Sequence, residues 1–363
     1  MTVIGREGPA APPGTTPFET GVHEQPGAAP RAPRTRRAVG LAIALAALVA
    51  LMLLSVAVGS KNIPLDGVLH GLFAYTGEGD DFVIWDLRVP RTVTGIVVGA
   101  ALGLAGALIQ ALTRNPLADP GILGVNAGAM LFVALGVAVL GVSSIQGYIW
   151  FALAGALLVT VAVFAIGAAG RSGVDPLRLT LAGMAVGAAL QGVVTGLMLL
   201  NTEAFNTMRT WNAGTLVGRG FDVLLPVLPF LGVGVLIAAG VAASLNAIAL
   251  GDDLARSLGI RIGRIRVLTV VAVTLLAGGA TAIAGPIGFV GLMIPHIARW
   301  ITGPDQRWIL AYTLVLAPSL VLASDVLGRV VMSPGELPVG VVTAFVGAPV
   351  LVVLVRRRKA SGL

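Results

Sequence analysis

The arrangement of the chain is set by residues 88–127, which read RVPRTVTGIVVGAALGLAGALIQALTRNPLADPGILGVNA. Two arginines, Arg88 and Arg91, precede a run of 22 residues without a charge, residues 92–113. Four glycines in this run are spaced by four, four and three residues, which places them on one helical face: Gly95, Gly99, Gly103 and Gly106. Small residues on one face allow two helices to approach closely in lipid. The stretch predicts a membrane span built for close packing, followed by a Pro/Gly/Asn-rich turn.

Composition predicts an all-α membrane protein. Hydrophobic residues make up 56% and charged residues 11% of the 363 residues, whereas soluble domains have about 25% charged residues. The absence of cysteine excludes disulfides and thiolate metal sites. The three histidines, His23, His70 and His296, lie far apart in the predicted topology, so we expect neither a metal site nor a cofactor.

The apolar runs predict ten transmembrane helices at about 20 residues per crossing. Residues 1–37 are rich in Pro, Ala and Gly and are expected to form a disordered basic tail. Residues 38–356 form the transmembrane domain, and residues 357–363 form a carboxyl-terminal tail. The predicted spans lie at residues 38–60, 92–113, 120–170 (two spans), 179–202, 223–245, 267–298 (a full and a shorter span), 308–324 and 337–355.

The distribution of basic residues predicts the orientation. With ten spans both termini lie on the same side, and both terminal segments are basic. Alternating the loops places 18 Lys and Arg residues on that side and six on the other. Because basic residues accumulate in cytoplasmic loops, both termini are expected to be cytoplasmic.

A weak internal repeat accompanies this topology. At an offset of 179 residues, Gly99, Ala101, Ala105, Gly106 and Pro116 recur as a second set: Gly278, Ala280, Ala284, Gly285 and Pro295. Because the two sets lie five spans apart, a true repeat would be inverted, as in many transporters. Chance among Gly- and Ala-rich helices explains the matches equally well.

A short helix is predicted between the sixth and seventh spans, in residues 246–266. Gly251 precedes two aspartates that suit the amino end of a helix. Gly259 is placed to end it. A short amphipathic helix on the basic side can dock into a soluble partner or lie on lipid as a connector, and the residues alone slightly favour the connector.

The segment GPIGFVGLMIPHIAR, residues 285–299, cannot form a regular helix throughout because it contains two prolines and three glycines. Irregular backbone at membrane depth is tolerated only inside protein or beside a watery cavity. We interpret this segment as part of a translocation pathway.

Five motifs occur in order along the chain: RVPRT, NPLADPGILG, GDDLARSLGI, GPIGFVGLMIPHIAR and ELPVGVVTAFVGAPVL. Together they resemble the permease subunit of the ABC importers for iron–siderophore, haem and vitamin B12. The resemblance covers residues 38–356. It implies a dimeric permease made with a second copy or a paralogue, two cytoplasmic ATPase subunits, an extracytoplasmic substrate-binding protein and a metal chelate as cargo.

The resemblance also implies roles for particular residues. Coupling to the ATPase falls to Asp252, Asp253, Leu254, Ala255, Arg256, Ser257, Leu258 and Gly259, which replaces the lipid-connector interpretation. Docking of the binding protein falls to Arg88, Arg91 and Arg329. The connector around residues 171–178 lies near where the family closes its inner gate. We assign the pathway or gate to the two turn-rich segments, through Asn115, Pro116, Gly121, Asn126, Gly285, Pro286, Gly288 and Pro295.

Other functional classes fit the sequence less well. An ion-coupled secondary transporter is expected to hold an acidic residue within a span, and none of the charge-free runs contains one. The chain has no GxxxxGK[ST] phosphate-binding loop, so ATP hydrolysis is assigned to a partner and the chain is not expected to be an enzyme. Iron–siderophore is the favoured cargo, with haem and cobalamin as alternatives.

Overall fold

The computed structural model of the chain describes residues 34–59, 63–74, 81–169 and 176–360. Every regular element in these residues is a helix, which confirms the all-α prediction. In chain order the elements are α1 (Arg34–Ala57), α2 (Leu65–Phe73), the π-helix η1 (Val83–Arg88), α3 (Val89–Thr113), the 3-10 helix η2 (Pro120–Leu123), α4 (Val125–Leu140), α5 (Ile145–Ala168), α6 (Pro176–Leu200), α7 (Thr202–Asn212), α8 (Phe221–Leu224), α9 (Leu228–Ala249), α10 (Asp252–Ser257), α11 (Ile262–Ala284), α12 (Val290–Thr302), α13 (Gln306–Val331) and α14 (Val339–Ala360).

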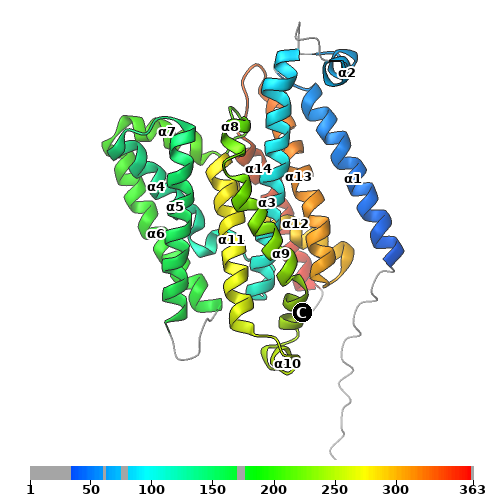
Figure 1. Cartoon of the computed structure of the whole chain (residues 1–363), viewed down its shortest axis with the longest axis vertical. Helices are drawn as coiled ribbons and strands as arrows, with labels where there is room; N and C mark the ends of the chain where they lie inside the picture. The colour runs from blue at the N-terminus through cyan, green and yellow to red at the C-terminus, as the bar shows by residue number, and fades with distance from the viewer. Residues whose placement is uncertain (1–33, 60–62, 75–80, 170–175, 361–363) are drawn as a thin grey trace, which may run out of the picture. The chain divides into compact units, whose positions relative to one another are not determined.

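Each of the ten predicted spans corresponds to one helix in Figure 1: α1, α3, α4, α5, α6, α9, α11, α12, α13 and α14. Among the described residues, seven helices are long and apolar enough to cross a membrane, and α4 is a shorter apolar helix. The helix α12 has only 13 residues. Both α4 and α12 follow irregular segments, residues 114–124 and 285–289, which account for part of the chain length in each predicted span.

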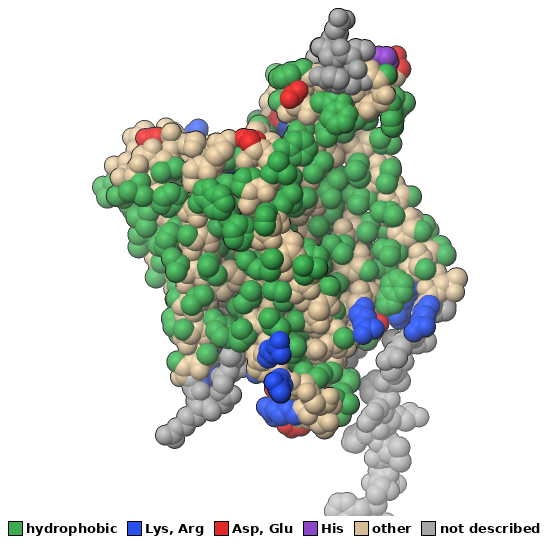
Figure 2. All heavy atoms as spheres, viewed as in Figure 1, with side chains coloured by type: hydrophobic (Ala, Val, Ile, Leu, Met, Phe, Trp, Pro, Cys, Tyr) green, Lys and Arg blue, Asp and Glu red, His purple; other side chains and the backbone are tan. Residues whose placement is uncertain are grey.

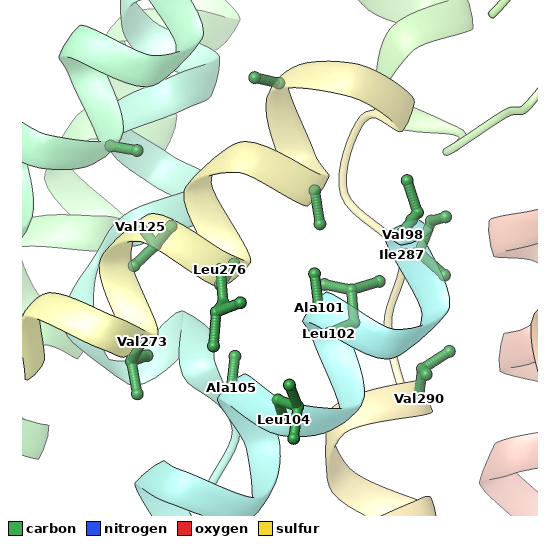
Figure 3. Packing of buried hydrophobic residues seen from close by; sticks show 14 of the residues in the cluster. Val98, Ala101, Leu102, Leu104, Ala105, Val125, Val273, Leu276, Ile287 and Val290 are labelled. Carbon is green, nitrogen blue, oxygen red and sulfur yellow. The ribbon is translucent and has the colours of Figure 1, made fainter. Parts of the chain in front are cut away.

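The glycine face of α3 packs closely, as predicted. A Cβ atom on Gly99 would lie 2.7 Å from the Cα of Pro318 in α13, and one on Gly103 would lie 2.5 Å from the Cβ of Ala317. A Cβ on Gly106 would overlap the carbonyl group of Gly291 in α12. Much of the rest of α3 is buried against α11. Figure 3 shows Ile287, in the segment before α12, and Val290, the first residue of α12, beside α3. The helix α3 is therefore the centre of the packing.

The packing of α3 and α11 has the symmetry expected of an inverted repeat. The helix α3 packs against α13 and α12, and α11 packs against α5 and α4, which are their counterparts five spans away. At equivalent positions, Gly99 faces Pro318 of α13, and Gly278 faces Ala156 of α5. In Figure 1, α3 and α11 run in opposite directions. These neighbours favour the repeat over chance.

Two helix boundaries differ from the predictions. The helix α1 begins at Arg34, four residues before the predicted start of the membrane domain, while residues 1–33 of the predicted tail lie outside the described residues. The helix α13 continues to Val331, so Asp325 and Arg329 lie within a helix rather than in the predicted loop. The two residues pair at a spacing of i and i+4, and this pairing allows charged residues to extend the helix.

The start of α3 also differs from expectation. Pro90 is expected to bias Val89 toward an extended backbone, but Val89 is helical, with φ −63° and ψ −51°. Its amide donates to the carbonyl of Ile84, five residues earlier, because the preceding turn is a π-helix. The wider turn accommodates the proline within a continuous helix from η1 into α3.

Candidate functional site

The predicted coupling segment forms α10, a six-residue helix between α9 and α11. Gly251 precedes it with φ +119°, and Gly259 follows it with φ +79°, a left-handed conformation that favours glycine. Ala255 is fully buried against Ile248 and Ile262, from the adjoining ends of α9 and α11. The helix is therefore held by a small apolar cluster of its own.

The opposite face of α10 is exposed. Leu254 is 47% and Leu258 61% exposed, and the side chains of Asp253 and Arg256 form a surface ion pair at 2.9 Å. Two exposed leucines on a short helix at the end of the bundle form an apolar surface suited to contact with another protein.

Asp252 connects α10 to two spans. Its carboxylate accepts hydrogen bonds from Arg114, at the end of α3, and from Arg266 in α11, with 2.9 Å to the Arg266 Nη2. Arg114 also donates to the carbonyl of Ile248 at 2.6 Å. Partial burial works to raise the pKa of Asp252, but the hydrogen bond from Arg114 and the charges of Arg266 and Arg114 outweigh it and hold the pKa below its usual value of 3.8. We call Arg114, Asp252 and Arg266 the inner clasp.

Neither Arg114 nor Arg266 is predicted from the sequence as a partner of Asp252. The local signal in the sequence is that Arg114 ends the glycine-rich span. In the structure this residue takes a left-handed conformation with φ 51°. Asp252 lies 138 residues away along the chain, so no spacing rule connects the two.

The three arginines predicted to dock the binding protein lie together at the end of the bundle opposite α10. Arg91 binds Asp325 through two nitrogens, at 2.7 and 3.0 Å, and contacts Glu336 at 2.8 Å. Arg329 binds Asp325 at 2.8 Å and donates to the carbonyls of Ser55 and Val58 near the end of α1. Arg88 donates to the carbonyls of Val56 and Ala57 at 2.7 Å each. We call these arginines with Asp325 and Glu336 the outer cluster.

Arginines that dock another protein are expected to point outward, and the geometry of the outer cluster differs from that expectation. Arg88 and Arg329 are each 5% exposed, and they bind carbonyl groups at the end of α1 that have no partner within that helix. Their predicted accessibility is therefore wrong in this structure. A cavity of about 110 Å³ remains between the three arginines and Glu336, open at one side.

The residues predicted to line the pathway have mainly structural contacts in a single chain. Asn115 accepts a hydrogen bond from the amide of Leu117, at 2.9 Å, and so shapes its own turn. Asn126 accepts from the Thr281 hydroxyl at 2.9 Å and joins α4 to α11.

Gly285 has φ +75° and packs against the carbonyl of Trp211, where a side chain would overlap. Pro116 and Pro286 are half-buried, and Gly121 lies beside Asp119. Gly288 is exposed, with open space where a side chain would project.

Pro295 lies inside α12 rather than at its end. It has no amide hydrogen to offer the carbonyl of Gly291, four residues earlier. Gln110 of α3 donates to that carbonyl at 3.4 Å and to the carbonyl of Leu292 at 3.0 Å. Thus a side chain of α3 supplies the donor that the proline lacks. Of the predicted inner-gate connector, residues 171–178, residues 171–175 lie outside the described residues, and residues 176–178 form the start of α6.

The sequence of the chain matches a known protein family. The model of the FecCD transport family matches residues 47–357. The chain belongs to the FecCD transport family.

Two permease proteins of bacterial transport systems resemble the chain over most of its length. It is 46% identical over 333 residues to the ferric enterobactin transport system permease protein FepD of Escherichia coli (strain K12), covering 90% of this chain and 98% of that protein. It is 39% identical to the siderophore transport system permease protein YfiZ of Bacillus subtilis (strain 168), covering 80% and 87%. A solved inward-facing structure of a metal-chelate type ABC transporter superposes with a TM-score of 0.78 at 26% identity, covering 88% and 99% of the two chains. The chain is thus a multi-pass membrane permease with the fold predicted from its motifs.

Proposed function

We propose that this FecCD-family chain is the permease subunit of an ABC importer that brings a ferric siderophore into the cell. The observation that carries the proposal is the 46% identity, over 90% of the chain, to a ferric enterobactin permease. The match to a metal-chelate transporter structure supports the same cargo class. The chain performs no covalent chemistry in this proposal, and ATP hydrolysis belongs to a partner subunit.

The exposed surfaces support a larger assembly. The helix α6 is the least buried of the seven long apolar helices, with 11% of its most apolar window buried. Its exposed side chains include Leu181, Met184 and Leu200. A second permease, identical or paralogous, would cover or face this surface, and the chelate would pass between the two copies. Two cytoplasmic ATPase subunits and an extracytoplasmic binding protein complete the importer.

We assign energy coupling to α10. Leu254 and Leu258 face outward, where an ATPase subunit can hold them, while Ala255 and Asp252 hold the helix to the permease. A displacement of α10 driven by ATP would therefore reach the end of α3 through Arg114 and α11 through Arg266. Because α3 and α11 occupy equivalent positions in the two halves of the bundle, one input would act on both halves.

The irregular segments are the proposed moving parts. Residues 114–124 lead into α4 and residues 285–289 lead into α12, so a shift of α3 or α11 would be transmitted to a backbone that lacks continuous helical hydrogen bonds. We assign gating to these segments, including Asn115, Gly121, Gly285 and Gly288.

We assign docking of the binding protein to the outer cluster in a modified form. An acidic side chain of the binding protein can enter the cavity beside Arg88, Arg91 and Arg329, where it would compete with Asp325 and Glu336 for the guanidinium groups. Arginine suits such an exchange because its planar group binds carboxylates through two nitrogens. If Arg91→Glu binds the binding protein with wild-type affinity and association rate at low ionic strength, this assignment fails.

The outer cluster also weighs against ion-coupled transport. Asp325 lies within α13, inside a helix where the sequence predicted no acidic residue, but it is held between Arg91 and Arg329. Both arginines occupy the Asp325 carboxylate, so it is not available as the ligand of a transported cation.

The cargo is tested by uptake of labelled ferric siderophores, haem and cobalamin into cells with and without the gene. Loss of ferric siderophore uptake alone is expected. A loss confined to cobalamin or haem would show that the iron assignment is wrong.

A further inference from the structure

A cavity of about 470 Å³ lies between α9 and α11, at the end of the bundle that carries α10. Its walls are apolar, and two arginines at the start of α11 line it. Its principal lining residues are Ile237, Gly240, Val241, Arg261, Arg264 and Leu268. A volume of this size is typical of ligand sites, which span about 300–1,000 Å³. We call it the inner groove.

The two arginines of the inner groove are exposed and carry an uncompensated positive charge. Both nearby aspartates of α10 pair elsewhere, Asp252 with Arg114 and Arg266 and Asp253 with Arg256. In the described part of the chain, no ion pair involves Arg261 or Arg264. The inner groove therefore offers two free cations beside an apolar wall.

The apolar wall continues into the surface that meets lipid. Exposed side chains of α9 and α11 extend from the groove along the bundle, among them Val233, Leu236, Val267 and Val271. On the face shown in Figure 2, hydrophobic side chains cover the middle of the bundle, and Lys and Arg side chains gather at the end with α10. The groove thus lies where acyl chains give way to headgroups on the side predicted to be cytoplasmic.

We propose that the inner groove binds an anionic phospholipid of the cytoplasmic leaflet. The lipid phosphate binds Arg261 and Arg264, and an acyl chain lies along Ile237, Val241 and Leu268. Basic pockets between membrane helices on the cytoplasmic side are suited to anionic headgroups. The apolar wall favours a lipid over a soluble phosphate, which would leave that wall exposed to water. The proposal requires the groove to lie on the cytoplasmic side of the membrane, and it does not require any particular cargo.

Lipid in this groove would also affect coupling. The cavity includes Gly259 and Ile260, which directly follow α10. A bound headgroup would therefore restrict the loop that joins α10 to α11 and favour one position of the coupling helix.

The test measures the affinity of the purified permease for phosphatidylglycerol and for phosphatidylcholine, with and without its ATPase subunits. Each arginine is expected to contribute roughly fivefold to phosphatidylglycerol affinity, so Arg261→Gln/Arg264→Gln should weaken binding by roughly 25-fold. Arg307→Gln is the matched control, because Arg307 is an exposed arginine at the start of α13 that does not line the groove. Gly240→Leu tests the wall with both arginines intact, since a Cβ at Gly240 meets no atom within 4 Å.

The expected result is preference for phosphatidylglycerol in the wild type and the control, and loss of that preference in both groove variants. Unchanged binding in the double arginine variant would overturn the proposal. Competition by inorganic phosphate at the affinity of the lipid would also overturn it, because the site would then recognise an ion. Loss of lipid when the ATPase binds would show instead that the arginines form a protein contact.

Discussion

Arg114, at the carboxyl end of α3, donates a hydrogen bond to the carboxylate of Asp252, the first residue of α10. The pair is partly exposed, with 42% and 26% of the two side chains accessible. Exposed ion pairs contribute about 0.2–1 kcal/mol to stability, so this contact adds little to the fold. Its importance is positional, because it joins the proposed coupling helix to the central span of the bundle.

Loss of the inner clasp should uncouple transport from ATP hydrolysis. In Asp252→Ala, α10 still docks to the ATPase through its leucines, but its motion no longer pulls on Arg114 and Arg266. We expect transport to fall at least tenfold while ATPase activity of the complex persists. Asp66→Ala, at an exposed position on α2 and far from α10, is the control and should transport normally. Equal losses in both variants would contradict the clasp.

The exposed leucines of α10 should be required for docking of the ATPase. Replacing Leu254 and Leu258 by Asp places two charges on the apolar surface, which should abolish transport and release the ATPase during purification. Insertion should be normal because both side chains are exposed in the isolated chain. Co-purification of the ATPase and uptake are the two measurements, and wild-type uptake would refute the assignment of α10.

Acid should release the inner clasp. Because the pKa of Asp252 is lowered in the folded chain, its stabilising contribution is fully present above the usual value of 3.8 and is lost as the pH falls through the lower folded value. Hydrogen exchange in residues 250–260 should be constant from about pH 5 to 8 and, after correction for intrinsic rates, increase below about pH 4. Asp252→Asn should remove this acid transition while leaving other segments unchanged. An acid transition of the same size in the variant would assign it to another group.

The outer cluster should stabilise the membrane domain strongly. Asp325 has 2% side-chain exposure and neutralises Arg91 and Arg329. Asp325→Asn leaves two guanidinium groups without their shared carboxylate, and breaking a buried pair costs roughly 3–5 kcal/mol. Thermal unfolding in detergent should show a large decrease in Tm, whereas Asp66→Asn, at an exposed position on α2, should leave it unchanged. A Tm within one degree of wild type would contradict the burial of this cluster.

The glycine face of α3 should tolerate no side chain at Gly106. A methyl group there overlaps the backbone of Gly291, which cannot move aside as a side chain can. We expect Gly106→Ala to destabilise the chain by about 1–3 kcal/mol or more. Gly192→Ala in α6 is the matched control, because a Cβ at Gly192 meets no atom within 4 Å. Thermal unfolding compares the two variants, and equal stability would mean that α3 and α12 are not in close contact.

The sequence alone was sufficient for features set by neighbouring residues. The spacing of Gly95, Gly99, Gly103 and Gly106 identified the face of α3 that packs closely, because helix geometry relates residues three and four apart. Gly251 and Gly259 marked the limits of α10, because both take positive φ values that glycine adopts readily. The length of each apolar run located the ten helices, although charged residues at the end of α13 concealed its last turns.

Only the tertiary structure decided which charges meet. Arg91 pairs with Asp325, which lies 234 residues further along the chain. Arg114 pairs with Asp252, which lies 138 residues further along. The sequence placed Arg88 and Arg329 at the correct end of the bundle but pointed them outward, whereas they bind the carbonyl groups near the end of α1. The direction of a long flexible side chain depends on the acceptors within its reach, and packing of distant helices determines where those acceptors lie. Local geometry therefore determines the helices, and the free energy of satisfying buried charges and carbonyls determines how their ends are joined.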